Sequence, residues 1–515
     1  MAAVTVLFFL TATFWALTIP HFDGPDEEEH FNSVSRLLQG GGWPLPYEAP
    51  LLGSTGQAMR EAGLPVEGEV LTEFVAPADR ATLEAATSLD DFGRDGMVHH
   101  PPGYYVLIAA GTAALGGETL RWDRASLAMR LLSAALLAGA VPFVIGSVRW
   151  ITGSATAGVG GGMSLFTVPF FTNMGGLISN DVLLITTATA CLYFAIRAWR
   201  ATYPARWMVL LSAVALGIAL LSKGFALFLL PTFAILCVLL ARRWHKDIPG
   251  RFTEALWPML VAFLVGGWWW LRNLIVLGVV QPSRYGAREA TGEQHEMYDF
   301  VLFFTQFWIR FNRLFWGRGA REDMALPAEI VDTAGVILLV LMVLALTVSR
   351  HRFILAVLLL FPAVTVAVLF MNAHGIYWDF GRHDRGVQGR YVFAGIVAYA
   401  AILAVVVHPL VQRLSTRMRT FLMAIGSTVA LTVTWVAITW VFVGLWHQVD
   451  KPGVVRRGAA EAIGVAEGVY PVLVSLTVIM HLVFLLMLVR WRFPEIKVLL
   501  LPSNTPLGVP RHARV

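Results

Sequence analysis

The sequence predicts an all-α integral membrane protein with about 12 to 14 transmembrane helices, because runs of roughly 20 mainly apolar residues recur along the chain. Of its 515 residues, 57% are hydrophobic and 14% are charged. Soluble domains usually carry about 25% charged residues. Substantial polar stretches occur only at 21–102, 276–332 and 446–468, so no soluble domain of ordinary size is left over.

The first apolar run, 1–20, is predicted to be an uncleaved transmembrane helix, because it lacks a basic start and a small-residue cleavage site. In the polar stretch 21–102, the amphipathic segments 32–38 and 77–86 are predicted to be short helices on the membrane surface. An aromatic segment at 300–316 is predicted to be half-inserted. The other apolar runs lie near 103–118, 126–148, 153–178, 182–196, 207–222, 224–241, 255–271, 333–349, 353–371, 391–411, 420–445 and 469–489.

Arginine sets the predicted orientation, since short cytoplasmic loops are enriched in basic residues. The basic segments are 197–206, 242–251, 350–352, 413–419 and the tail 491–515. They are expected in the cytoplasm, which places 21–102, 276–332, 372–390 and 446–468 outside. The predicted units are therefore 1–20, 21–102, a membrane core 103–275, an outer segment 276–332, carboxy-terminal helices 333–490 and the tail. Strict alternation leaves one run too many between 103 and 255, so either 103–118 or 150–180 is expected not to cross fully.

A dense acidic cluster stands directly after the first predicted helix, where the stretch 23–31 reads DGPDEEEHF. Carboxylates here can act as a general base on a hydroxyl, or hold a divalent cation beside a phosphate. Neighbouring Asp26 and Glu27 would point about 100° apart on a helix, so one can face a reaction while the other supports it. The simpler alternative is a solvated start of a surface helix. The candidate residues of this cluster are Asp23, Asp26, Glu27 and His30.

Three further polar groups interrupt apolar runs, where the bilayer makes polarity costly. His99 and His100 open the motif HHPPGYY and can donate to phosphate oxygens or bind a metal, or they simply flank a helix start. Asn180 and Asp181 lie between two apolar runs, where a helix cap is the alternative. Lys223 lies between two more runs and is either a phosphate contact or an interfacial loop lysine.

A cationic cluster lies on the outer side of the predicted topology, where the stretch 381–391 reads GRHDRGVQGRY. The orientation rule predicts few arginines there, so the cluster favours capture of an anionic head group such as a lipid phosphate. Arg284, in the preceding outer loop, is expected to assist. The candidate phosphate ligands of the cluster are Arg382, His383, Arg385, Gln388, Arg390 and Tyr391.

Several function classes are disfavoured. The net charge of +5 does not indicate a nucleic-acid partner, because the basic residues are spread over short loops between apolar runs. The chain has no Walker loop, GxGxxG or CxxC motif, which argues against an ATP-driven pump and a soluble nucleotide-sugar enzyme. Cys191 and Cys237 lie inside apolar runs and are expected to be reduced packing residues.

Taken in order, the motifs resemble those of GT-C membrane glycosyltransferases, a superfamily that includes protein O-mannosyltransferases and lipid A aminoarabinose transferases. DEEEHF resembles the acidic motif of their first outer loop, and HHPPGYY resembles the start of their second helix. GGLISND, LSKGF and VQGRYVF resemble more particularly the bacterial DUF2142 family. The resemblance implies a GT-C-like bundle with a long first outer loop carrying short interfacial helices. It also implies a multi-pass protein of the bacterial plasma membrane, with its active face outside.

The resemblance further implies a reaction, in which a polyprenyl-phosphate-linked sugar is transferred to a glycan, lipid or protein acceptor. The catalytic carboxylate would be Asp26, with Glu27 beside it, although the acidic row is longer than the pair usual in the family. A divalent cation, Mg²⁺ or Mn²⁺, would be held by Asp26, Glu27 and His100 if one takes part. The acceptor side would include Asp23, His30, Asn180 and Asp181. The donor phosphate would meet His99, His100, Lys223, Arg284 and the cationic cluster.

Two other functions remain open from the sequence. A transporter or flippase of lipid-linked sugars would use the same cations, with the acids as proton relays, but it needs charges at broken helices in mid-membrane. A non-catalytic membrane protein of envelope assembly would be indifferent to Asp26→Asn. The transferase hypothesis requires the acidic and cationic clusters to meet at one outer face.

Overall fold

The computed structural model describes residues 1–46, 48–64, 75–84, 94–283, 298–317, 326–382, 385–446 and 452–492. Apart from two isolated β-bridges, the regular structure of these residues is helical, which confirms the predicted all-α membrane fold. Nine of the described helices are long and apolar enough to cross a membrane. Three shorter apolar helices of 10 to 17 residues are also described, Ala2–Thr18, Gly103–Ala114 and Arg206–Leu220.

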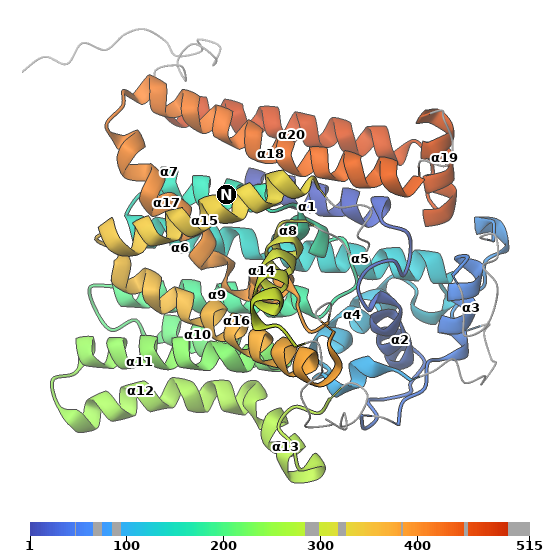
Figure 1. The fold of residues 1–515 in the computed structure, drawn as a ribbon, viewed down its shortest axis with the longest axis horizontal. Coiled ribbons are helices and arrows are strands. Elements are labelled where there is room, and N and C mark those ends of the chain that lie inside the picture. Colours follow the sequence, from blue (N-terminus) through green and yellow to red (C-terminus); the bar gives the residue numbers. More distant parts are fainter. Residues whose placement is uncertain are drawn as a thin grey trace, which may run out of the picture.

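Most of the long helices lie side by side along the long axis of the molecule (Figure 1). Helix α14 (Phe300–Trp316) runs across this direction (Figure 1). The other helices of the bundle are α1 (Ala2–Thr18), α4 (Gly103–Ala114), α5 (Trp122–Ala138), α6 (Ala140–Thr152), α9 (Asp181–Arg200), α10 (Arg206–Leu220), α11 (Leu230–Trp244), α12 (Ile248–Ala262), α13 (Trp268–Leu277), α15 (Ala328–Val348), α16 (Arg352–Phe380), α17 (Ile396–Gln412), α18 (Thr416–Trp446) and α20 (Val469–Arg492).

Shorter elements connect or interrupt these helices. They are α2 (Glu27–Leu38), α3 (Gly53–Glu61), η1 (Pro77–Asp79), η2 (Gly96–His99), η3 (Gly117–Thr119), α7 (Ala155–Met163), η4 (Ser164–Thr167), α8 (Pro169–Met174), η5 (Gly224–Leu229), the π-helical turn η6 (Phe263–Gly267), η8 (Gly389–Gly395) and α19 (Pro452–Ile463). In Figure 1, α2, α3 and α19 gather at one end of the bundle, beyond the ends of α1 and α18.

Either 103–118 or 150–180 was expected not to cross fully, and in the structure neither forms a single helix as long as a full span. Helix α4 has 12 residues. The stretch 150–180 breaks into α7 with 9 residues, the 3-10 turn η4 and α8 with 6 residues. The break follows the sequence, because Pro169 opens α8, and Gly175 and Gly176 follow its end. A Cβ added to Gly176 would lie 2.6 Å from the backbone nitrogen of Ala16, so this glycine lets α8 approach α1 closely.

The two predicted surface helices of the polar stretch 21–102 fare differently. Segment 32–38 is part of α2, but α2 is largely buried instead of lying on the surface. Segment 77–86 is not a helix in its described part. After the turn η1 it runs extended, since the amides of Leu83 and Glu84 bind the carbonyls of Leu120 and Glu118. Backbone pairing with a neighbouring segment has outweighed local amphipathicity there.

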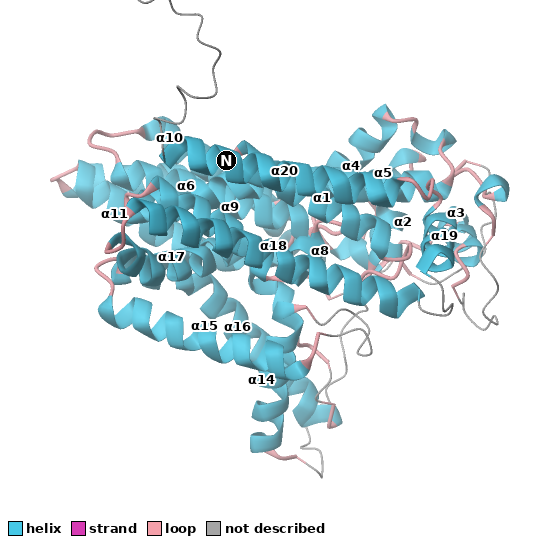
Figure 2. Ribbon diagram, turned by 90° about the horizontal axis from the view of Figure 1, so that it is seen from above, coloured by secondary structure: helices cyan, strands magenta, loops and turns pink. Residues whose placement is uncertain are grey.

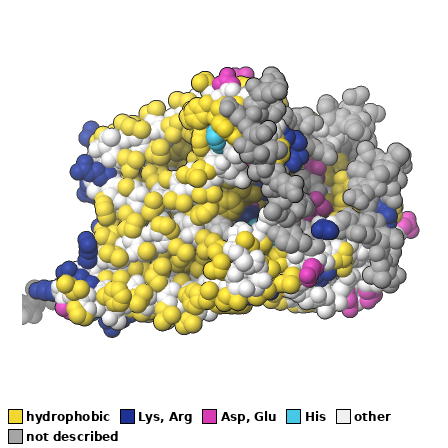
Figure 3. Space-filling model, turned by 60° about the horizontal axis from the view of Figure 1, so that its bottom comes forward, with side chains coloured by type: hydrophobic (Ala, Val, Ile, Leu, Met, Phe, Trp, Pro, Cys, Tyr) yellow, Lys and Arg dark blue, Asp and Glu magenta, His cyan; other side chains and the backbone are white. Residues whose placement is uncertain are grey.

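The two ends of the bundle differ in charge. Figure 3 shows a group of Lys and Arg side chains at one end and most of the visible Asp and Glu at the other, where some Lys and Arg also occur, with a largely hydrophobic flank between the ends. The basic end is where α9, α11 and α17 finish. The opposite end holds α2 (Figure 2), and the acidic cluster forms the N-cap and first turn of this helix. The bundle therefore has the charge polarity expected of a membrane protein.

Candidate functional site

The acidic cluster turns two neighbouring carboxylates in different directions. Asp26 is the N-cap residue of α2 and adopts a left-handed backbone, with φ 59° and ψ 21°. Aspartate tolerates this conformation better than most residues, and such outliers are found at functional sites. Its side chain is 31% exposed and lines a cavity. The side chain of Glu27 is fully buried and points into the bundle.

Glu27 is held by Arg130 of α5, a residue that the sequence analysis missed. Arg130 Nε and Nη2 donate to the two Glu27 carboxylate oxygens over 2.8 and 2.6 Å. The same guanidinium donates to the carbonyls of Ala16, Ile19 and Pro20 at the end of α1. An arginine inside the apolar run 126–148 is itself a signal of function, and this signal could have identified Arg130 from the sequence. Through Arg130, Glu27 therefore helps to fix the connection between α1 and α2, whereas the Asp26 side chain faces the cavity.

The distant motifs meet in one cavity of about 600 Å³. It lies between α2, η2, η5, α16 and the start of η8. Lys223 and Arg390 are almost fully buried in its wall. The predicted site residues that line it are Asp26, His30, His99, His100, Lys223, Gln388, Arg390 and Tyr391.

Charges of alternating sign run through the wall of this cavity. Lys223 Nζ donates to Asp181 Oδ1 over 2.8 Å. Arg390 Nε lies 3.5 Å from Asp181 Oδ2, and Arg390 Nη2 lies 3.5 Å from Asp26 Oδ2. Asp181 is thus buried between the two cations, which explains how a carboxylate is tolerated there. Asp181 therefore lies on the cationic side of the cavity, whereas the sequence analysis grouped it with the acceptor side.

Aromatic rings flank the two cations. Lys223 Nζ lies 4.8 Å from the ring centre of Tyr391, and the Tyr391 and Phe225 rings lie 4.2 Å apart. Arg390 lies 5.4 Å from the Tyr391 ring. Phe225 and Phe228 of η5, with Val368 and Leu369 of α16, give the cavity an apolar side. The cavity thus joins a cationic wall to an apolar one.

The histidines of the cavity are held by the first polar loop. His30 Nδ1 bonds to Tyr105 Oη over 2.9 Å. Burial lowers the pKa of His30 to about 3, against the nearby Asp26 charge, so the ring is neutral near pH 7. His99 and His100 follow Asp95, whose buried carboxylate accepts from Asn32, Ser33 and the Met97 amide. Burial raises the pKa of Asp95.

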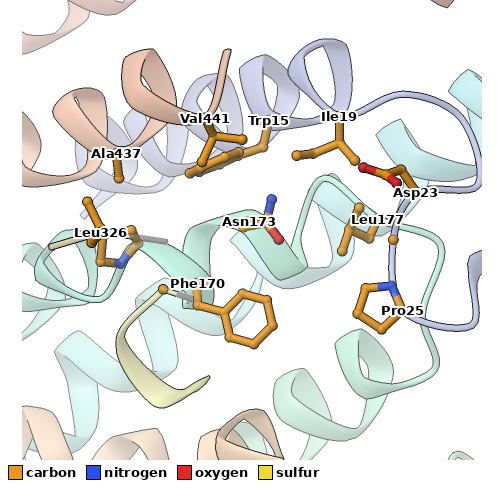
Figure 4. Close-up of a pocket in the computed structure, with 13 residues that line it drawn as sticks. Trp15, Ile19, Asp23, Pro25, Phe170, Asn173, Leu177, Leu326, Ala437 and Val441 are labelled. Atoms are coloured by element: carbon orange, nitrogen blue, oxygen red, sulfur yellow. The ribbon is translucent and has the colours of Figure 1, made fainter. Parts of the chain in front are cut away.

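Some predicted site residues lie elsewhere. Asp23 lines a separate cavity of about 50 Å³, shown with Pro25, Asn173 and Leu177 in Figure 4. Asn180 is buried and donates to the carbonyl of Ser222. Arg382 and Arg385 are exposed and are not among the residues that line the main cavity. Arg284 and His383 lie outside the described residues.

The predicted metal ligands Asp26, Glu27 and His100 do not fit together as a metal site. Both Glu27 oxygens are taken by Arg130, and they also accept from the amides of Gly24 and Ile178. Throughout the described part of the chain, no group of three or more His, Cys, Asp and Glu could hold a metal ion.

Three solved structures show limited likeness to this chain. Cupriavidus metallidurans ArnT bound to undecaprenyl phosphate matches with a TM-score of 0.45 and 16% identity, over 98% of this chain and 82% of that one. The S. cerevisiae protein O-mannosyltransferase Pmt1–Pmt2 complex bound to the sugar donor gives 0.36 and 16%, over 55% and 34%. The Archaeoglobus fulgidus oligosaccharyltransferase in complex with Zn and sulfate gives 0.38 and 12%, over 86% and 52%. At these TM-scores the likeness supports no inference about function.

No curated protein matches the chain. One family does match, under the description "Predicted membrane protein (DUF2142)", over residues 8–399. The residues that line the main cavity run from Asp26 to Tyr391, so all of them lie within this range. The chain belongs to the DUF2142 family of membrane proteins.

Proposed function

We propose that the protein is a membrane glycosyltransferase that moves a sugar from a polyprenyl-phosphate donor to a hydroxyl of a cell-envelope acceptor. One observation carries the proposal. A partly exposed carboxylate, Asp26, and two buried cations, Arg390 and Lys223, line the same cavity. The reaction needs a base for the incoming hydroxyl and positive charge for the departing phosphate, and this cavity offers both.

The donor phosphate binds at the cationic wall. The contact of Arg390 with Asp26 is long, at 3.5 Å, so a phosphate oxygen can replace the Asp26 carboxylate there. Asp181 remains between Arg390 and Lys223 and keeps both side chains in place. Binding of the donor thus frees Asp26 for the acceptor. The apolar side formed by η5 and α16 suits the isoprenoid chain of the donor.

The chemical step is a single displacement. Asp26 takes the proton of the acceptor hydroxyl, and the oxygen attacks the anomeric carbon of the sugar. The bond from that carbon to the phosphate oxygen breaks, and the phosphate leaves with the bonding electron pair beside Arg390 and Lys223. Because a phosphate is a good leaving group, positioning and electrostatics supply most of the catalysis.

The placement of the charges supports a transferase over a transporter. Asp181 is the first residue of α9, Lys223 directly precedes η5, and Arg390 is the second residue of η8. The helices that begin there end at the basic loops of the opposite end. The site charges therefore stand at one end of the bundle, whereas a transporter needs them at broken helices in mid-membrane. By the positive-inside rule, we place this end on the outer face of a bacterial plasma membrane.

The test is transfer by the purified chain in proteoliposomes that contain a radiolabelled polyprenyl-phosphate sugar and an envelope extract as acceptor. We expect Asp26→Asn to lower turnover by about 10²- to 10⁴-fold, the usual contribution of a general base. Glu28→Gln, in the same acidic row but away from the cavity, is the matched control. Equal turnover of Asp26→Asn and wild type would refute the role of Asp26. Passage of intact donor across the bilayer without sugar transfer would favour a transporter.

A further inference from the structure

The turn that leads from α1 to Asp26 is bound by residues from the far end of the chain. Tyr470 Oη of α20 donates to the Leu17 carbonyl over 2.8 Å. Trp446 Nε1, at the end of α18, donates to the Thr18 carbonyl over 3.0 Å. Leu17 and Thr18 are buried, and Tyr470 is only 3% exposed. With the three carbonyls bound by Arg130, the last turn of α1 has all its carbonyls from Ala16 to Pro20 engaged by side chains.

Contacts also run in the opposite direction, from the amino-terminal loop to α19. Arg80 Nη2 donates to the Glu461 carbonyl over 2.9 Å. Burial, with the Arg130 charge nearby, lowers the pKa of His21 well below its usual value, so its ring is neutral. The Ile463 carbonyl can only accept, so His21 Nε2 donates to it and Nδ1 accepts from Ser126. These bonds engage carbonyls of the last turn of α19, of which that of Glu461 also accepts from the Gly464 amide.

A glycine makes the docking of α19 possible. Gly464 follows α19 with φ +80°, the usual glycine position after a helix. A Cβ at this position would lie 2.0 Å from Asp123 Oδ2 and 3.1 Å from Arg80 Nη1. Asp123 is the carboxylate that holds Arg80, over 2.9 Å. A larger residue at 464 would therefore push α19 away from the loop.

Apolar packing joins the same elements. Phe14 of α1 packs edge-on against Trp435 of α18 and Tyr470 of α20. Figure 4 shows Ala437 and Val441 of α18 across a small cavity from Asp23, three residues before Asp26. Helices α18 to α20 lie beyond residues 8–399, which the family shares. The main cavity lies within the residues matched by the family, whereas α18 to α20, which pack beside the turn before Asp26, lie outside them.

We infer that α18 to α20 act as a clamp that positions the Asp26 carboxylate, with Tyr470 and Trp446 as positioning residues. The inference rests on the proposed function, because it assigns the clamp a part in that reaction. The clamp fixes the end of α1 at Thr18, and Asp26 follows eight residues later. Phe22 and Asp26 in this connection have φ of 65° and 59°, in the small left-handed region that leaves a side-chain-bearing residue little freedom. A base displaced by about 1 Å can lose on the order of 10²-fold in rate.

The test compares Tyr470→Phe and Gly464→Ala with the control Tyr399→Phe in the purified full chain. Tyr399 is also a buried phenol with a hydroxyl bond, to Thr167 of η4, but it lies away from the turn. Hydrogen–deuterium exchange of peptides that cover 17–26 is measured first. Tyr470→Phe should raise their exchange about fivefold, which corresponds to one lost hydrogen bond of about 1 kcal/mol. Gly464→Ala should raise it at least as much, and Tyr399→Phe should leave it unchanged.

The second readout is transfer kinetics. Tyr470→Phe should lower kcat by up to about 100-fold and leave KM for the donor unchanged, because the clamp touches neither Arg390 nor Lys223. Unchanged exchange in both variants would overturn the clamp. Raised exchange with normal kcat, or KM and kcat changing together, would overturn the positioning role. If wild type transfers no sugar, the proposed function and the positioning role both fail, while the exchange data still decide whether the clamp holds the turn.

Discussion

The buried pair of Glu27 and Arg130 should be strongly coupled in stability. Both side chains are fully buried, and their closest atoms lie 2.6 Å apart. Two charges about 4 Å apart interact by about 4 kcal/mol at an effective dielectric constant near 20. In Arg130→Met the Glu27 carboxylate keeps only the Gly24 and Ile178 amides. Removing one partner of a buried pair costs about 3 to 5 kcal/mol, because the other charge is left uncompensated.

A double-mutant cycle measures this coupling. The free energy of unfolding is determined in mixed micelles for wild type, Arg130→Met, Glu27→Gln and the double variant. We expect a coupling energy of about 3 kcal/mol. Arg130→Met leaves the buried Glu27 charge without its partner, and Glu27→Gln removes that charge. The control cycle uses Arg206→Met and Glu254→Gln, a pair in which Arg206 is 62% exposed. Exposed pairs contribute about 1 kcal/mol or less.

The result that refutes the reasoning is a coupling energy for Glu27 and Arg130 no larger than that of the control pair. It would mean that Glu27 is solvated or neutral in the folded protein. Glu27 could then face the cavity, and the assignment of Asp26 as the outward carboxylate would fail with it.

Three further predictions concern the cavity. The pKa of His30 in the folded protein is about 3, so between pH 6.5 and 3 only the unfolded chain binds a proton at this residue. The free energy of unfolding should therefore fall as pH falls through this window, by up to about 1.4 kcal/mol per pH unit. In denaturant titrations at several pH values, His30→Gln should weaken this pH dependence by the equivalent of one proton. A Cβ at Gly389 would lie 2.3 Å from the Phe315 backbone nitrogen. Gly389→Ala should therefore displace Arg390 and lower the rate of sugar transfer on the order of 10²-fold. The control Gly375→Ala should transfer at the wild-type rate, because nothing lies within 4 Å of a Cβ at that position. Lys223→Gln should raise KM for the donor more than about tenfold, since a hydrogen bond to a charged group contributes about 1.5 to 3 kcal/mol; an unchanged KM would remove Lys223 from the phosphate site.

The sequence by itself determined that the protein is a helical membrane protein, and it identified the candidate site residues. The backbone of a long apolar run in lipid is satisfied by a helix, so the approximate positions of these helices could be predicted without a structure. Isolated polar groups between such runs are costly, which is why Asp181 and Lys223 could be identified as candidates. Arg390 was identified for another reason, because it belongs to a group of arginines in a predicted outer loop, where few are expected. The basic loops predict the orientation by the positive-inside rule.

Only the tertiary structure decided which of these groups share a cavity and which way each one points. Helical geometry predicts that Asp26 and Glu27 diverge, but the direction depends on Arg130, which lies 103 positions from Glu27. Arg390 reaches Asp26 across 364 positions, and the exposed Arg382 and Arg385 of the same motif do not line the cavity. Such choices depend on long-range burial and pairing of charges. Local periodicity cannot supply them, because it fixes the angle between neighbouring side chains and not the partner that each one meets.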